Sequence, residues 1–137
     1  MGKSIRAVWQ GNFKEGRGQL NIENSELNKV TIKPFFAKSD GSFTNPEELL
    51  ASAHASCYTM TLSYILAESG LSAENIETSV SLVISNNVIT NSNLILQAKI
   101  PGITEEQFQD FALKAKEMCT VGNALKYEIS IEATLIQ

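Results

Sequence analysis

The chain has 137 residues, enough for one domain that buries about two-thirds of the surface of its unfolded chain. Its formal net charge of −4, without a basic stripe, argues against nucleic acid or an anionic membrane as a partner. No apolar run reaches the roughly 18 residues that a membrane span needs. The first nine residues contain no apolar signal core. We therefore expect a single cytoplasmic domain covering residues 1–137.

The first 36 residues are predicted to form strands. Apolar and polar side chains alternate over residues 5–9 and again over residues 20–22, as in half-buried strands. The glycine-containing turn of residues 16–18 separates these two segments. The apolar residues within 30–36, which end in two phenylalanines, predict a third strand.

A long helix is predicted from residue 46 to residue 70. Asn45 is suited to the N-cap, Pro46 to the first helical position, and Glu48 follows three residues after the cap. Gly70 is a typical C-terminal stop. Side chains three or four residues apart predict one inward stripe: Leu50, Ala53, Cys57, Met60 and Tyr64.

The second half of the chain predicts a hairpin, a helix and a final strand. Residues 77–85 and 94–100 are expected to pair around the asparagine-rich stretch 86–93. Thr104 and Gln107 predict a capping box that starts the second helix, which Gly122 should break or bend. Its buried stripe is expected to consist of Phe108, Ala112, Ala115 and Cys119.

Residues 127–135 alternate again as a last strand. The order of strands, helix, strands, helix and strand predicts an α+β fold, with mainly antiparallel sheets packed on two helices.

Cys57 and Cys119 are the two cysteines of the chain, and each lies on the predicted apolar stripe of a helix. Buried cysteines are commonly inert core residues. If the two helices pack face to face, however, the thiols approach each other, and a disulfide requires Cα atoms within about 7 Å. Inert thiols, a redox pair and part of a metal site therefore all remain open.

A reactive cysteine needs a group that stabilises its thiolate. Neither cysteine lies at a predicted helix N-terminus, so we expect a cation to do this. The chain has two arginines, Arg6 and Arg17. Arg17 is the better candidate because it stands between two glycines, although a solvated turn residue would look the same.

Glu47 could orient such an arginine through a bidentate pair, or it could simply complement the helix dipole. It precedes Cys57 by ten residues, which is about 15 Å along one straight helix. If both residues belong to one site, a second subunit must supply one of them. This spacing favours an obligate homodimer with shared active sites.

His54 lies one helical turn before Cys57 and has three interpretations. It could act as a base. It could join Cys57 and Cys119 as a three-ligand zinc site, although no fourth ligand is evident. A histidine on the flank of a helix is most often a packing residue.

Residues 44–57, TNPEELLASAHASC, resemble the signature of the OsmC/Ohr family, and the likeness extends over almost the whole chain. The resemblance implies an intertwined homodimer that reduces organic hydroperoxides, and also hydrogen peroxide, without a cofactor. It further implies that Cys57 is the peroxidatic thiol, that Cys119 is the resolving thiol, and that Glu47 pairs with an arginine. An external dithiol would reduce the resulting disulfide.

The chain departs from the family pattern at two places. The family commonly has Cys-Pro-x-Ser at its second cysteine, whereas this chain has Cys119 followed by Thr-Val-Gly. Ala37, next to Lys38, occupies the position of the OsmC-type arginine, while Arg17 lies where the Ohr branch takes its arginine. The supporting cation is therefore Arg17 or Lys38. The alternative function is a dimer of this fold that binds a small molecule or zinc without peroxidase activity.

Overall fold

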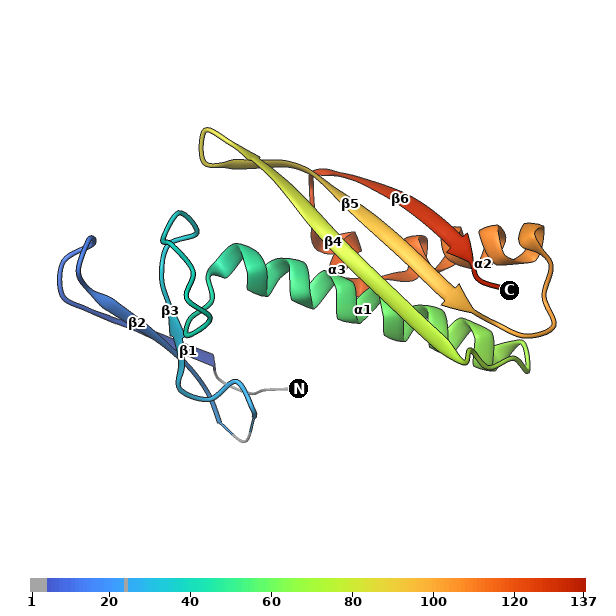
Figure 1. Cartoon of the computed structure of the whole chain (residues 1–137), viewed down its shortest axis with the longest axis horizontal. Helices are drawn as coiled ribbons and strands as arrows, with labels where there is room; N and C mark the ends of the chain where they lie inside the picture. The colour runs from blue at the N-terminus through green and yellow to red at the C-terminus, as the bar shows by residue number, and fades with distance from the viewer. Residues whose placement is uncertain (1–4, 24) are drawn as a thin grey trace. The chain divides into compact units, whose positions relative to one another are not determined.

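The computed structural model describes residues 5–23 and 25–137. The first four of the nine residues that contain no apolar signal core lie outside the described residues. The chain forms two compact units, residues 1–50 and residues 51–137. Among the described residues, no helix is long and apolar enough to cross a membrane. The helices and strands of both units are labelled in Figure 1.

The N-terminal unit contains a three-stranded antiparallel sheet in the order β1-β2-β3. Its strands are β1 (Ile5–Gln10), β2 (Arg17–Ile22) and β3 (Val30–Ile32). A Cβ at Gly18 would come within 2.5 Å of the Ile32 side chain and 2.8 Å of the Trp9 ring. The close approach of these residues across the sheet therefore requires glycine at position 18.

The third strand is shorter than the sequence predicted. Phe35 and Phe36 lie beyond its end and are exposed. Pro34 has no N–H group with which to continue the strand pairing. Instead, the carbonyl of Pro34 accepts a hydrogen bond from the N–H of Ala37 at 3.0 Å, which turns the chain.

The C-terminal unit contains a second sheet, in which the central strand β5 is antiparallel to β4 and parallel to β6 (Figure 1). Its strands are β4 (Asn75–Ser85), β5 (Val88–Lys99) and β6 (Glu128–Leu135). The helices of the chain are α1 (Pro46–Glu68), α2 (Glu105–Met118) and α3 (Thr120–Ala124). The predicted α+β class with mainly antiparallel sheets is confirmed, and α3 was not predicted.

The β4–β5 hairpin has a much tighter turn than the sequence suggested. Asn86 and Asn87 alone connect the strands, with φ values of 50° and 64°. Positive φ at both central residues is characteristic of type I′ hairpin turns, and asparagine tolerates this region well. The predicted loop of residues 86–93 is therefore wrong, because most of it belongs to β5.

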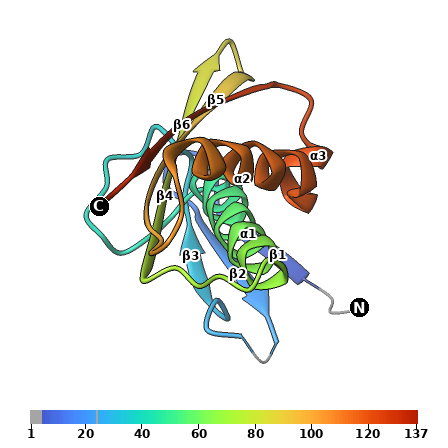
Figure 2. The ribbon, with the colours of Figure 1, turned by 90° about the vertical axis from the view of Figure 1, so that its right-hand side faces the viewer.

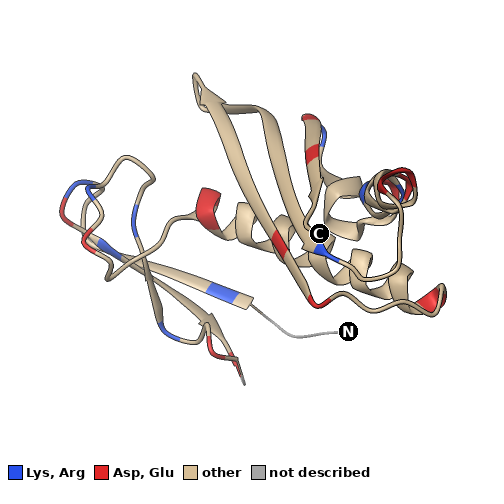
Figure 3. Ribbon diagram, turned by 45° about the vertical axis from the view of Figure 1, so that its right-hand side comes forward, with Lys and Arg blue, Asp and Glu red and all other residues tan. Residues whose placement is uncertain are grey.

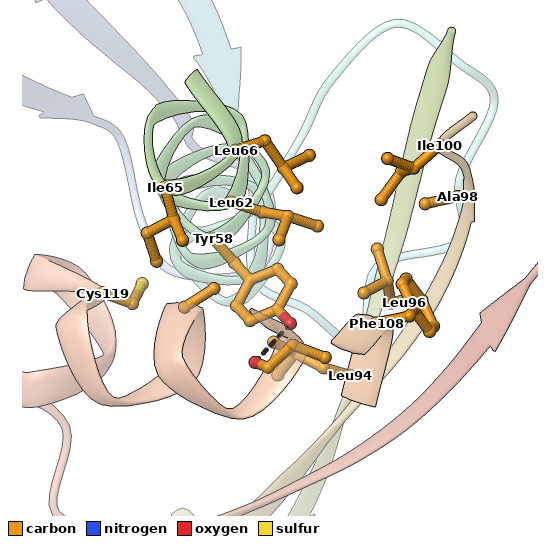
Figure 4. Packing of buried hydrophobic residues seen from close by; sticks show 12 residues of the cluster. Tyr58, Leu62, Ile65, Leu66, Leu94, Leu96, Ala98, Ile100, Phe108 and Cys119 are labelled. Atoms are coloured by element: carbon orange, nitrogen blue, oxygen red, sulfur yellow. Dashed lines mark hydrogen bonds between the residues drawn. The ribbon is translucent and has the colours of Figure 1, made fainter. Parts of the chain in front are cut away.

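The core of the C-terminal unit lies between α1, α2 and the sheet. Figure 4 shows Tyr58, Leu62 and Leu66 projecting from α1 toward side chains of β5 and α2. The predicted inward stripe of α1 is wrong, since Met60 is 70% exposed and Tyr64 is 57% exposed. Periodicity failed here because α1 is apolar on more than one side, so spacing alone does not identify the side that meets the sheet.

Helix α2 follows its prediction closely. Thr104 and Gln107 form the capping box, with hydrogen bonds of 3.1 Å and 2.9 Å in the two directions. Its predicted stripe is buried: Phe108, Ala112, Ala115 and Cys119. The Tyr58 hydroxyl donates to the carbonyl of Ala112 at 2.8 Å, which fixes α1 against α2 (Figure 4).

The core assignment predicts that two identical substitutions have different costs. Leu62 is 0% exposed and Leu113 on α2 is 52% exposed. Leu62→Ala should lower the free energy of unfolding by about 3 kcal/mol, because it leaves a cavity. Leu113→Ala should cost less than about 1 kcal/mol. Denaturant titration of both variants checks this, and equal costs would contradict the assigned packing.

Candidate active site

Cys119 lies at the junction of two helices. It is the C-cap of α2 and the N-cap of α3, with an extended backbone (φ −67°, ψ 111°) that continues neither helix. Its buried Sγ accepts a hydrogen bond from the N–H of Gly122 at 3.5 Å. Figure 2 shows the chain changing direction between α2 and α3.

This junction corrects two expectations from the sequence. The break falls at Cys119 rather than at Gly122, and Cys119 does lie at a helix N-terminus. The Cys119 side chain accepts a hydrogen bond from the N–H of the residue three positions later, as a serine does at an N-cap. Such a bond competes with continuation of the preceding helix. The signal was present in the sequence as Cys119 followed by Gly122, but a cysteine is rarely read as a cap.

Cys57 is half-buried on α1 and lies near several groups that can donate a hydrogen bond toward its sulfur. Burial by itself raises the pKa of this thiol. The N–H of Val121 and the thiol of Cys119 oppose that effect by donating to the sulfur. The Thr61 hydroxyl and the N–H of Thr120 act in the same direction, and together these donors hold the pKa of Cys57 below its ordinary value.

The backbone donors near Cys57 are a second means of stabilising its thiolate, besides the cation that the sequence predicted. Thr120 and Val121 are the first residues of α3, where backbone N–H groups have no helical partner. Such groups stabilise a nearby anion. The groups that favour the thiolate form of Cys57 therefore belong to the C-terminal unit, which contains both cysteines.

Cys119 has the opposite electrostatic environment. Burial raises the pKa of the Cys119 thiol, and the neighbouring Cys57 raises it further, although the N–H groups of Gly122 and Val121 act against both. The two thiols are close enough for each to shift the pKa of the other. One thiol is thus disposed to ionise while its neighbour keeps its proton.

Glu47 and Arg17 both belong to the N-terminal unit. Glu47 lies in the acidic first turn of α1 (Figure 3), and its Oε2 is buried without a hydrogen-bond partner in the described part of the chain. Arg17 is the first residue of β2, opposite Gln10, and is exposed. Within residues 5–23 and 25–137, no ion pair joins Arg17 to Glu47. Lys38 is also exposed.

His54 is buried beside α3. A Cβ at Gly122 would stand 3.1 Å from its Nε2. Burial lowers the pKa of His54, so the imidazole is neutral near pH 7. No group of three or more His, Cys, Asp or Glu side chains in the described residues could hold a metal ion, so His54, Cys57 and Cys119 do not form the zinc site that the sequence left open.

An apolar groove of about 530 Å³ adjoins Cys57. It is lined by Cys57 together with Ala53, Ser56, Met60, Thr61, Tyr64, Met118 and Val121. Four of these residues belong to the stripe that the sequence predicted to face the core of the protein. The stripe is real, but it faces this groove, where it places the half-buried thiol against an apolar surface.

The fold and the two unequal thiols define an α+β protein with a paired-cysteine site. The chain matches the family model described as OsmC-like protein over residues 39–134. Peroxiredoxin OsmC of Escherichia coli (strain K12) is 36% identical over 138 residues, which cover 97% of this chain and 96% of that protein. The chain therefore belongs to the OsmC-like family, as its sequence signature indicated.

Other relatives agree with this assignment. An organic hydroperoxide resistance protein-like protein of Staphylococcus aureus (strain MSSA476) is 23% identical over 85% of this chain and 84% of its own length. The crystal structure of an OsmC-like protein from Mycoplasma pneumoniae has a TM-score of 0.81 at 17% identity, covering 100% of this chain and 99% of that chain. An OsmC-like protein of unknown function from Vibrio cholerae has a TM-score of 0.79 at 17% identity, over 97% and 99%. At these identities the two structures establish the fold.

The hydrogen bonds at Cys57 predict the effect of one conservative substitution. The Thr61 hydroxyl donates to the backbone carbonyl of Cys57 at 2.8 Å and lies close enough to the thiol to lower its pKa. Thr61→Val should therefore raise the pKa of Cys57, so that alkylation of Cys57 by iodoacetamide at pH 7 becomes slower. Alkylation rates measured against pH in a Cys119→Ser background check this.

Thr59→Val is the matched control for this experiment. Thr59 lies on the same helix and likewise donates its hydroxyl to the carbonyl four residues earlier, but that carbonyl belongs to Ala55 rather than to Cys57. The control should leave the pKa of Cys57 unchanged. Equal shifts in both variants would show that the Thr61 hydroxyl has no specific role.

Proposed function

We propose that this chain is a cysteine-based peroxidase that reduces organic hydroperoxides, with hydrogen peroxide as a second substrate. The observation that carries the proposal is the contact between Cys57, whose pKa is lowered, and Cys119, whose pKa is raised, beside an apolar groove. The names of the relatives, a peroxiredoxin and an organic hydroperoxide resistance protein-like protein, support a peroxide substrate.

The Cys57 thiolate attacks the terminal oxygen of the hydroperoxide. The O–O bond breaks, the alkoxide takes up a proton and leaves as the alcohol, and Cys57 becomes a sulfenic acid. Cys119 then condenses with the sulfenic acid, forming a disulfide and releasing water. A dithiol reductant restores both thiols by exchange. These steps require no metal or organic cofactor.

The N–H groups of Thr120 and Val121 serve two purposes in this scheme. Before the reaction they stabilise the thiolate of Cys57. They also remain available to stabilise charge at the sulfur while the peroxide, which we expect to enter through the adjoining groove, reacts with it. The apolar lining of the groove favours a hydroperoxide with an alkyl or aryl substituent over hydrogen peroxide, which has a hydrogen atom in its place.

Glu47 and a cation complete the proposed site in a homodimer. The buried, unpartnered Oε2 of Glu47 is suited to a guanidinium, and Arg17 is our first choice over Lys38. Since Glu47 and Cys57 are about 15 Å apart along a helix, the second subunit supplies the carboxylate and the cation. We propose that each chain contributes a single domain to this dimer and acts in the cytoplasm; the E. coli relative, which aligns with 97% of the chain, supports the single domain.

Rapid thiol oxidation is the first expected result. The reduced protein should lose two thiols per chain within one turnover when mixed with cumene hydroperoxide, and more slowly with hydrogen peroxide. Cys57→Ser should abolish the reaction. Cys119→Ser should retain a single oxidation of Cys57 but lose sustained turnover. Stopped-flow mixing with thiol counting checks this.

Oxidation no faster than that of an ordinary exposed thiol would contradict the proposal. The groove beside Cys57 would then indicate the alternative function, a dimer of this fold that binds a small molecule.

Substitution of the two candidate cations distinguishes between them. Arg17→Met should slow oxidation of Cys57 by about 100-fold, because a charge donor at the reacting oxygens is lost. Lys38→Met also removes one positive charge, from the residue next to the position of the OsmC-type arginine. This variant should oxidise Cys57 at nearly the rate of the unmodified protein. The reverse result would assign the role to Lys38. Single-turnover rates with cumene hydroperoxide provide the measurement.

A further inference from the structure

Condensation of the two cysteines presents a chemical problem that the proposed function leaves unsolved. Cys119 must lose its proton to attack the Cys57 sulfenic acid, yet burial raises the pKa of the Cys119 thiol. The backbone groups that bond its sulfur, the N–H of Gly122 and the N–H of Val121, donate rather than accept. A base near Cys119 would remove this obstacle.

His54 is the titratable group placed to serve as that base. A Cβ built on Gly122 would lie 3.1 Å from the Nε2 of His54. The same Cβ would lie 3.5 Å from the Sγ of Cys119. Both atoms therefore border the space that the missing side chain of Gly122 leaves free. A proton can cross this space after a small movement of the side chains, or through one water molecule.

The surroundings of His54 favour a neutral imidazole with access to solvent. The side chain is 1% exposed, and its Nδ1 has no hydrogen-bond partner among the described residues. It borders a hollow of about 250 Å³ that is also lined by Lys116, Glu117 and Asn123. This hollow provides a path by which the proton can exchange with water. None of its lining residues lines the groove beside Cys57.

We propose that His54 is the general base of the disulfide-forming step, and that Gly122 keeps the space between His54 and Cys119 open. The inference rests on the proposed peroxidase function. The imidazole takes the proton of the Cys119 thiol as its sulfur attacks the sulfur of Cys57. The S–S bond forms, the S–O bond breaks, and the departing hydroxide receives the proton from the imidazolium and leaves as water. Cys119 is oxidised and Cys57 is reduced, so no further oxidant is needed.

The two steps are separated by quenched-flow mixing of the reduced protein with one equivalent of cumene hydroperoxide. Mass spectrometry then follows the Cys57 sulfenic acid, trapped with dimedone, and the disulfide. In His54→Gln, sulfenic acid should form at the normal rate, while condensation should slow by about 100-fold. Glu117→Gln, which changes a titratable group at the same hollow, should condense normally.

A second variant tests whether the effect is chemical. In His54→Ala, added imidazole should restore condensation through the hollow, which a merely structural role of His54 would not allow. Normal condensation in both His54 variants would overturn the inference, as would an equal slowing of both steps. Failure of the unmodified protein to form a sulfenic acid at Cys57 would instead refute the peroxidase function itself.

The pH dependence of condensation in the unmodified protein gives an independent readout. The titratable groups around His54 are Lys116 and Glu117 at the hollow, Cys119, and Tyr58, whose pKa is raised by burial and by Cys119. With a histidine base whose pKa lies below 6.5, the rate should be level near neutral pH and fall as the pH drops through that pKa. A rate that rises tenfold per pH unit through neutral pH would show unassisted ionisation of Cys119 and contradict the inference.

Discussion

The interruption of the helix at Cys119 determines the chemistry of this protein. An unbroken helix from residue 105 to residue 124 would use the N–H groups of Thr120 and Val121 in its own hydrogen bonds. Because the chain becomes extended at Cys119 and the Cys119 sulfur caps the next helix, these two N–H groups are free to bond the sulfur of Cys57. One local change of backbone direction therefore creates the anion-stabilising environment and places the second thiol beside it.

The same junction makes the two thiols unequal. Cys57 is half-buried, faces an apolar groove and lies near donors that lower its pKa, whereas Cys119 is buried and its pKa is raised by burial and by the neighbouring Cys57. Two neighbouring groups whose pKa values are driven apart are suited to different roles. This inequality explains why we assign the attack on peroxide to Cys57, and why we infer that deprotonation of Cys119 requires help from His54.

Local signals predicted much of the fold correctly. The capping box at Thr104, the α1 start at Asn45 and Pro46, and the buried stripe of α2 all depend on residues close in sequence. The errors arose where several arrangements satisfied the local pattern. The apolar stripe of α1 that includes Met60 faces a groove, and most of the asparagine-rich segment before residue 94 is strand rather than loop.

The sequence by itself determined the family, the α+β class and the identity of the two cysteines, because these follow from a specific signature and from short-range periodicity. It did not determine the environment of either thiol. Apart from Thr61, the donors near the sulfur of Cys57 belong to residues 119–121, more than 60 positions away, and the void beside His54 depends on the side chain that Gly122 lacks. Such contacts exist only after α1, α2 and α3 have packed together, since they join backbone groups that no local pattern specifies.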